Sequence, residues 1–283
     1  MIQYGPLLGV IQVKGDEPMW YSWRRTMCRL IGIVGKHPLP VIDVLAAFFP
    51  LGTAGHVKCT MKPGHLDGWG LSGFSAKRAV YFDRRAEAVT EGKKAFELAA
   101  QKAAKSQSPI VMGHLRKASE GAPEISNTHP FHYRDWIFAH NGTIFGASAS
   151  FPLRDARPQG QTDSERFFLW LAEALYSAHD RTDALAGLLK KSREGLVYSA
   201  LNFLMTDGER LWAYREFGDK RFDPGETLAE REKYYTLYVT RVDRSAVVCS
   251  EPLKSVSKFW QPLSQRTLAV FTPDMIAPRT MSI

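Results

Sequence analysis

Cysteine is scarce in this sequence, and the few cysteines form no pattern that is typical of a disulfide-linked fold or of a metal site. Cys28, Cys59 and Cys249 are odd in number, widely spaced and without a CxxC pair, which argues against a disulfide framework and against a cysteine zinc site. The histidines show no recognisable ligand spacing, so we expect no metal and no cofactor. A reducing compartment, the cytoplasm, is the default for such a chain.

Long apolar runs and long runs of one charge are also missing. No apolar run reaches transmembrane length. Residues 4–13 are apolar, but no basic region precedes them and no small-residue cleavage site follows, so they do not read as a secretory signal. The formal net charge is +8, but the basic residues are spread along the chain without a long block of one sign. We therefore expect neither a membrane span nor nucleic-acid binding.

The apolar runs that are present have strand or helix length, and the 283 residues suffice for a large core. Their order is strands, helices and then more strands, with no repeat and no low-complexity linker, which predicts one α+β domain with sheets and helices packed in layers. Strands are expected at 30–34, 68–74, 78–83, 108–116, 135–144, 199–216, 234–240, 245–251 and 267–272. Helices are expected near 40–49, at 91–106 on an exposed face, and at 162–178 and 183–194.

Three local signals mark where elements begin and turn. Thr162 and Glu165 fit a capping box, in which the hydroxyl takes the N3 amide and the Glu returns to the N–H of the cap. The Asp-Gly pair at 207–208 predicts a hairpin. The Asn-Gly pair at 141–142 is a turn signal because both residue types tolerate positive φ.

Polar residues gather at the ends of apolar runs in four stretches: MCRL at Cys28, GHLRKAS at Arg116, NTHPF to AHNGTI at 127–144, and QTDSE at Asp163. Each has an ordinary interpretation by itself. A lone cysteine is most often a small buried hydrophobe, a lone arginine a surface or ion-pair residue, Asn-Gly a turn, and Asp at a helix start a favourable charge for the dipole. No single stretch identifies a function.

Together and in this order, the stretches resemble the class II glutamine amidotransferases, the N-terminal-nucleophile glutaminases, and among them the stand-alone members without a fused synthase domain. The matching pieces are MCRL, HLDGWG (65–70), GHLRKAS, NTHPF, AHNG and TDSE. The resemblance covers essentially all of residues 28 to about 265. The resemblance implies a four-layer αββα sandwich of the N-terminal-nucleophile hydrolase type over 28–283, preceded by an extension at 1–27.

The resemblance also implies roles for particular residues. Cys28 would attack the side-chain amide of glutamine or of another γ-glutamyl compound. In this family the base is the α-amino group of the cysteine itself, whose pKa of about 7.7–8.0 lets it accept a proton near neutral pH. A peptide nitrogen inside a chain cannot do this, so the position of the first residue matters.

The remaining roles concern the substrate and the developing charge. Asn141 and Gly142 would form the oxyanion hole from one side-chain amide and one backbone N–H. Arg116 would hold the substrate α-carboxylate, and Asp163 would pair with its α-ammonium. The family pattern makes His129 part of the pocket wall, although a structural, hydrogen-bonded histidine is an equally good interpretation.

Three neighbouring residues need separate comment. His140 precedes the oxyanion asparagine and should point to the opposite face, because side chains alternate along a strand. Asp67 is expected to be structural. Lys117 follows Arg116, where the fused members carry a tryptophan, which favours the stand-alone branch and leaves the acceptor open.

The 27 residues before Cys28 allow three interpretations. Translation begins at Met27 and the methionine is removed, or residues 1–27 are a propeptide cut before Cys28, or the extension is retained and Cys28 lacks its base. We favour the first. The expected activity is hydrolysis of a γ-glutamyl amide through a cysteinyl thioester, with a small γ-glutamyl peptide or conjugate as substrate and a separate synthase or acceptor subunit as an open partner.

Two alternatives remain. The first is a non-catalytic subunit that binds glutamine or a γ-glutamyl compound and serves a partner enzyme. The second is a papain-like Cys-His protease, which is weaker because its flanking signature is absent and because it leaves Arg116 and Asp163 unexplained.

Overall fold

The computed structural model describes residues 28–36, 39–57, 64–74, 80–119, 121–218, 227–275 and 277–283. The expected extension at 1–27, and Cys59, lie outside the described residues.

Two antiparallel sheets form the centre of the described part of the chain. One sheet has the strand order β13 (Gln261–Pro262), β11 (Tyr238–Val242), β12 (Ser245–Cys249), β1 (Arg29–Gly35), β4 (Ile110–Leu115), β2 (Trp69–Phe74) and β3 (Val80–Arg85). The other has the order β15 (Arg279–Ser282), β14 (Thr267–Phe271), β10 (Leu211–Arg215), β9 (Asn202–Thr206), β6 (Trp136–Asn141) and β5 (Phe131–Tyr133). A short ribbon pairs β7 (Ile144–Phe145) with β8 (Val197–Tyr198).

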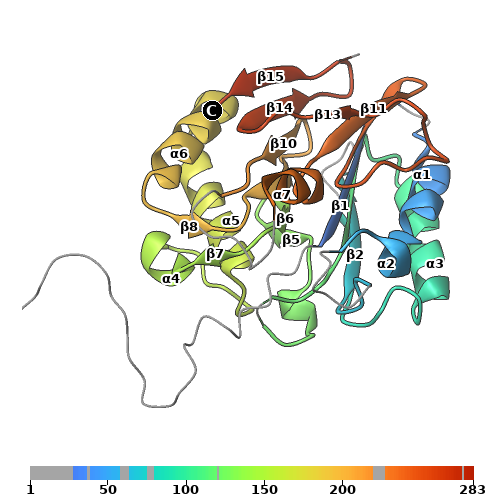
Figure 1. Cartoon of the computed structure of the whole chain (residues 1–283), viewed down its shortest axis with the longest axis horizontal. Helices are drawn as coiled ribbons and strands as arrows, with labels where there is room; N and C mark the ends of the chain where they lie inside the picture. Colours follow the sequence, from blue (N-terminus) through green and yellow to red (C-terminus); the bar gives the residue numbers. More distant parts are fainter. Residues whose placement is uncertain are drawn as a thin grey trace, which may run out of the picture.

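Helices cover the outer face of each sheet, which gives four layers (Figure 1). Helices α1 (Val41–Phe48) and α3 (Lys93–Lys105) lie against the sheet that contains β1, while α5 (Asp163–Leu175) and α6 (Arg181–Arg193) lie against the sheet that contains β6. Shorter elements are α2 (Leu51–Ala54), η2 (Ile125–Asn127), α4 (Ala147–Ser150) and α7 (Leu228–Tyr234). The expected α+β fold with αββα layers is confirmed.

The sequence of strand β1 is apolar without interruption because both faces of the strand are buried. Ile31 and Ile33 pack in the cluster under α1 and α3, whereas Leu30 and Val34 pack in the cluster between the two sheets. A strand with a buried layer on both faces needs apolar side chains at every position, since successive residues point to opposite sides. The same division between two clusters holds for β4, β6 and β9.

Two predicted elements differ from the structure. The helix α3, expected to be exposed, buries Phe96, Ala99 and Ala103 against the sheet, because its small alanines make one apolar stripe. The expected strand at 234–240 begins only at Tyr238. Its first residue, Tyr234, ends α7, and residues 235–237 connect this helix to the strand. Helix α7 starts at a complete capping box between Thr227 and Glu230.

The capping box expected at the start of α5 is half right. The N–H of Glu165 donates to Thr162 Oγ1 at 3.2 Å, as predicted. The Glu165 carboxylate, however, accepts from the N–H groups of Gln159 at 2.9 Å and Gly160 at 2.7 Å instead of from the cap. The loop before the helix directs its N–H groups at this buried carboxylate, which holds the segment that precedes Asp163 in place.

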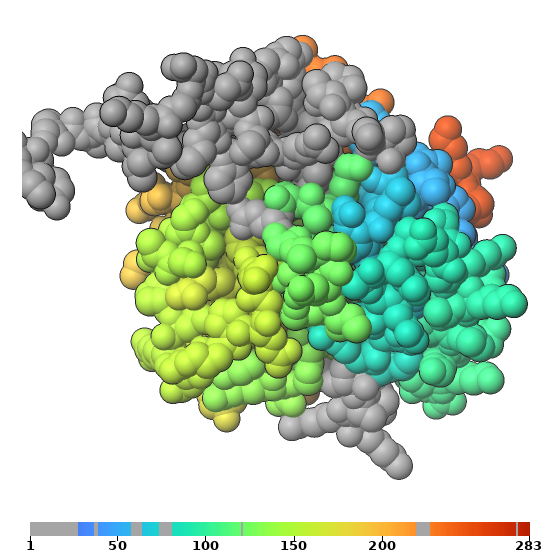
Figure 2. Space-filling model, turned by 90° about the horizontal axis from the view of Figure 1, so that it is seen from below, coloured from blue at the N-terminus to red at the C-terminus, as the bar shows by residue number. Residues whose placement is uncertain are grey.

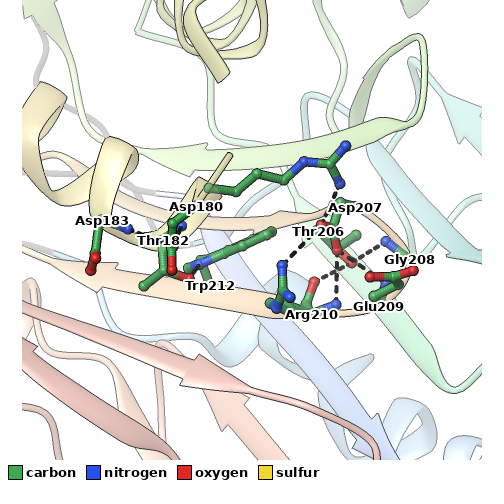
Figure 3. Close-up of polar contacts among 10 residues, drawn as sticks. Asp180, Thr182, Asp183, Thr206, Asp207, Gly208, Glu209, Arg210 and Trp212 are labelled. Carbon is green, nitrogen blue, oxygen red and sulfur yellow. Dashed lines mark hydrogen bonds and ion pairs between the residues drawn. The ribbon is translucent and has the colours of Figure 1, made fainter. Parts of the chain in front are cut away.

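The predicted hairpin at 207–208 joins β9 to β10 (Figure 3). Gly208 adopts φ +87°, a conformation that favours glycine. The Asp207 carboxylate accepts the N–H groups of Glu209 and Arg210 and pairs with Arg181 of α6 at 2.7 Å. Trp212 Nε1 donates to Thr182 Oγ1 at 3.0 Å, so the outer helix is tied to the hairpin at two points.

No helix in the described ranges combines the length and the apolar character that crossing a membrane requires.

Candidate active site

Cys28 and Asn141 come together from the strands of two different sheets. Cys28 immediately precedes β1, and Asn141 is the last residue of β6. The backbone N–H of Cys28 donates to Asn141 Oδ1 at 2.9 Å across 113 positions of sequence. Asn141 has the same strand parity as Ile137 and Ala139, which pack between the sheets, so its side chain faces Cys28 rather than α5.

The other half of the Asn141 side chain has no partner. Asn141 is completely buried, and its Nδ2 lacks a hydrogen-bond acceptor among the residues that the structure describes. Leaving a buried donor unsatisfied costs about 1–3 kcal/mol, so a native protein keeps one only for a reason. A donor held in place beside a cysteine is suited to an oxygen atom of a ligand.

The sulfur of Cys28 lies against the backbone of Lys117. Sγ is 3.5 Å from the Lys117 carbonyl oxygen and 3.4 Å from its nitrogen. Burial raises the pKa of the Cys28 thiol to about 11, although the Lys117 N–H and the charge of Arg116 act in the opposite direction. The thiol is therefore protonated at neutral pH and needs a base to become a nucleophile.

Arg116 lies one residue from the atoms that hold the sulfur, and its guanidinium is buried. It donates to the carbonyl oxygens of Asp67 at 3.3 Å, Gly121 at 3.0 Å and Ala122 at 3.1 Å. The side chain of Asp67 in turn accepts the N–H of Ala118 at 2.8 Å. These contacts brace the loop after β4 and give Asp67 the structural position that we expected.

Asp163 is the first residue of α5 and is buried. Its Oδ2 accepts the N–H of Ile144 at 2.6 Å, two residues after Gly142. The expected ammonium-binding carboxylate therefore also holds the end of the Asn-Gly segment in place.

Gly142 is required by close packing and not by a turn conformation. Neither Asn141 nor Gly142 has a positive φ, so that part of our interpretation is wrong. A Cβ on Gly142 would lie 2.0 Å from the carbonyl oxygen of Ala200 and 2.6 Å from its carbonyl carbon. Only glycine lets the two backbone segments approach this closely.

His129 lies in a buried group of rings near Arg116. Its ring centroid is 4.3 Å from that of His114 and 4.2 Å from that of Phe131. Burial, together with the positive charges of Arg116 and Arg84, lowers the pKa of His129 well below its usual value, so the ring is neutral. Neither ring nitrogen of His129 has a hydrogen-bond partner within the described ranges, which does not support the interpretation as a hydrogen-bonded structural histidine.

Asn127 is a site residue to which we had given no role. Its Nδ2 donates to the Ala122 carbonyl at 3.1 Å, and its Oδ1 accepts the N–H of Gln161 at 2.7 Å. It thereby joins the loop around Arg116 to the segment that precedes Asp163. Figure 2 shows the chain after β4 (green) between the region of α3 (teal) and that of α4 and α5 (lime to yellow). No local pattern marked Asn127 for this role, because the two loops that it joins come together only on folding.

The described residues contain no group of three or more His, Cys, Asp or Glu side chains that could hold a metal ion.

The family model of the class II glutamine amidotransferases matches residues 27–281. A protein of Escherichia coli (strain K12) named "Putative glutamine amidotransferase YafJ" is 30% identical over 203 residues, which cover 66% of this chain and 72% of that one. A "Putative glutamine amidotransferase" of Haemophilus influenzae is 28% identical over 204 residues, covering 67% of this chain and 63% of that one.

Solved structures share the fold at lower identity. The glutamine phosphoribosylpyrophosphate amidotransferase of Bacillus subtilis aligns with a TM-score of 0.61 and 16% identity, over 90% of this chain and 49% of that one. A structure titled "glutamine aminotransferase class-II domain protein", from Silicibacter pomeroyi, aligns with a TM-score of 0.54 and 19% identity, over 90% of this chain and 99% of that one. The chain therefore belongs to the class II glutamine amidotransferases, a family whose general function is cleavage of the glutamine side-chain amide.

Proposed function

We propose that this protein hydrolyses a γ-glutamyl amide through a thioester on Cys28. The observation that carries the proposal is the pairing of Cys28 with Asn141: Oδ1 holds the Cys28 nitrogen at 2.9 Å, and the buried Nδ2 has no partner among the described residues. One side chain thus orients the group expected to act as base and presents a donor for the oxygen that becomes negative. Asn141 is completely buried, so water does not compete for its Nδ2, which strengthens such a hydrogen bond.

The reaction requires Cys28 to be the first residue. Its free α-amine then takes the thiol proton as Sγ attacks the amide carbon, and the carbonyl electrons move to oxygen. Asn141 Nδ2 and the Gly142 N–H stabilise that oxyanion. The amine passes its proton to the leaving nitrogen, which departs as ammonia or an amine, and water cleaves the thioester by the same steps in reverse.

The substrate assignment follows from charge. Arg116 would meet the α-carboxylate and Asp163 the α-ammonium of a γ-glutamyl group, with His129 in the wall of the same pocket. A small γ-glutamyl peptide or conjugate fits this pattern, and a separate subunit that receives the ammonia is compatible with it. A reducing cytoplasm suits a mechanism that depends on a free thiol, and Cys28 and Cys249 are both unbridged.

The first measurement is the intact mass and N-terminal sequence of the protein purified from its own host. It is followed by release of ammonia and glutamate from glutamine, with Asn141→Asp as the informative variant. Aspartate keeps the oxygen that accepts from Cys28 but lacks the donor, so we expect kcat to fall about 10²–10³-fold. Cys28→Ala should be inactive, and unchanged far-ultraviolet circular dichroism serves as the folding control for both.

The alternative, a binding subunit, makes a different prediction in the same experiment. A mature chain that begins before Cys28 and binds glutamine without cleaving it supports that alternative and contradicts the hydrolase. A papain-like protease is not supported, because the sulfur's hydrogen-bond partners among the described residues are both main-chain atoms of Lys117 and include no histidine.

A further inference from the structure

His140 is buried directly beside the proposed oxyanion residues, and the reaction above does not use it. It occupies the β6 position before Asn141 and is 1% exposed. Its side chain points toward α5, as strand alternation predicted. Both ring nitrogens are engaged: Nδ1 lies 2.8 Å from Ser164 Oγ, and Nε2 lies 3.2 Å from the carbonyl oxygen of Ala200.

The partners determine where the ring carries its proton. A carbonyl oxygen only accepts, so Nε2 bears the hydrogen and donates it to Ala200. Burial lowers the pKa of His140 to about 4, so the ring is neutral near pH 7 and Nδ1 accepts. The single hydroxyl hydrogen of Ser164 is then directed to His140.

On one side, this arrangement reaches the proposed ammonium-binding carboxylate. Ser164 Oγ lies 3.3 Å from Asp163 Oδ1, which is longer than its 2.8 Å contact with His140. With the Ser164 hydrogen directed to His140, Oδ1 of Asp163 does not receive it. Asp163 Oδ2 meanwhile holds the N–H of Ile144 at 2.6 Å. The hydrogen bond between Ser164 and His140 instead ties the first turn of α5 to β6. Asp163 precedes Ser164 in that turn, so the position of its carboxylate depends on this hydrogen bond.

On the other side, the arrangement reaches the oxyanion glycine. The Ala200 carbonyl that accepts from His140 is the group on which Gly142 packs, since a Cβ there would lie 2.0 Å from that oxygen. A shift of the Ala200 carbonyl therefore moves Gly142 and the direction of its N–H.

We propose that His140 is a positioning residue that couples recognition of the substrate ammonium to the oxyanion hole, through Ser164 and Asp163 on one side and the Ala200 carbonyl and Gly142 on the other. The inference rests on the proposed function. It assigns different kinetic effects to the two nitrogens: the Nε2 contact acts on the transition state, and the Nδ1 contact acts on substrate binding.

Three substitutions separate the two contacts. His140→Gln places an amide near Nε2, and should keep kcat within about twofold while raising KM about tenfold. His140→Asn places an amide near Nδ1, and should lower kcat about tenfold or more at a nearly unchanged KM. Ser164→Ala leaves the histidine intact and should repeat the effect of His140→Gln. Each variant is made in the full chain in its own host, carries the N-terminus that the cell produces, and is checked by thermal unfolding.

A second readout does not depend on turnover. The amide resonances of Gly142 and Ile144, assigned by nuclear magnetic resonance, report the two ends of the proposed link. His140→Asn should move the Gly142 resonance, and Ser164→Ala should move that of Ile144. The inference is overturned if folded His140→Asn and Ser164→Ala proteins keep both resonances and the parent KM and kcat.

Failure of the proposed function has a different signature. In that case the unsubstituted protein does not hydrolyse glutamine, or it hydrolyses glutamine at the same rate as Asn141→Asp. The resonances of Gly142 and Ile144 still decide then whether His140 connects the two groups.

Discussion

Replacing Gly142 with alanine tests the oxyanion assignment by adding one methyl group. The added Cβ would lie 2.0 Å from the Ala200 oxygen, whereas real Cβ atoms essentially never approach closer than 3.0 Å. About 1 Å of separation must therefore be opened between the two backbones. A misplacement of this size at a reacting group costs about 10²-fold in rate, close to the 10²–10³-fold typical of a lost oxyanion donor. We expect kcat for glutamine hydrolysis to fall about 10²-fold.

Stability must be separated from catalysis in this experiment. Overpacking a tight contact typically costs about 1–3 kcal/mol, so the free energy of unfolding in urea is measured beside kcat. Gly35→Ala is a matched control, because its Cβ would lie 2.8 Å from the Arg244 carbonyl oxygen at the far end of β1, roughly 20 Å from Cys28. Gly187→Ala is the second control, because nothing lies within 4 Å of its Cβ. In the helix α6 it should stabilise the protein by about 0.5–1 kcal/mol.

The comparison between variants decides the outcome. The controls should keep the parent kcat whatever their stability, and only Gly142→Ala should lose it. A folded Gly142→Ala protein with kcat within twofold of the parent refutes the placement of the oxyanion at this glycine.

Three further predictions concern Cys28, Arg116 and Asp207. In a chain that retains residues before Cys28, burial holds the thiol pKa near 11. The rate of Cys28 alkylation, followed by peptide mass spectrometry, should therefore rise about tenfold per pH unit from pH 7 to 10. A plateau of that rate near pH 8 contradicts this prediction. Arg116→Lys keeps the charge but loses the planar fork, so KM for glutamine should rise at least tenfold, and parent kinetics would remove the carboxylate assignment. Asp207→Asn keeps an oxygen for the turn but loses the ion pair with Arg181, so the free energy of unfolding should fall by about 1–3 kcal/mol in urea titration, and an unchanged value shows that the pair contributes nothing.

The local elements of this protein follow from its sequence. Apolar runs of strand length predicted β1, β4, β6 and β9, because a strand buried on both faces carries no polar alternation. The Asp-Gly pair at 207–208 predicted the hairpin, since the positive φ of Gly208 is a local requirement of the turn. The residues near Cys28 were recognisable only as an ordered set, through their resemblance to a family.

What the sequence alone could not determine are contacts between segments that are distant along the chain. Glu165 has the spacing of a capping box, but which amides it binds depends on how the preceding loop folds back. Gly142 looks like a turn glycine, yet it is needed because the backbone of Ala200, 58 positions away in the printed sequence, approaches it. Asn127 and His140 gain their roles from loops and helices that touch them only after folding.

The physical reason for this division is the range of the interactions. Backbone conformation and the periodicity of burial depend on near neighbours, so composition and spacing along the chain encode them. The fit of one buried donor to one carbonyl depends on distances of a few tenths of an ångström between strands and loops, and no local pattern records those distances. The sequence by itself therefore determined the strands, the helices and the family. The tertiary structure decided that Asn141 holds the Cys28 nitrogen, that Ala200 packs on Gly142, and that His140 contacts Ser164 and the Ala200 carbonyl.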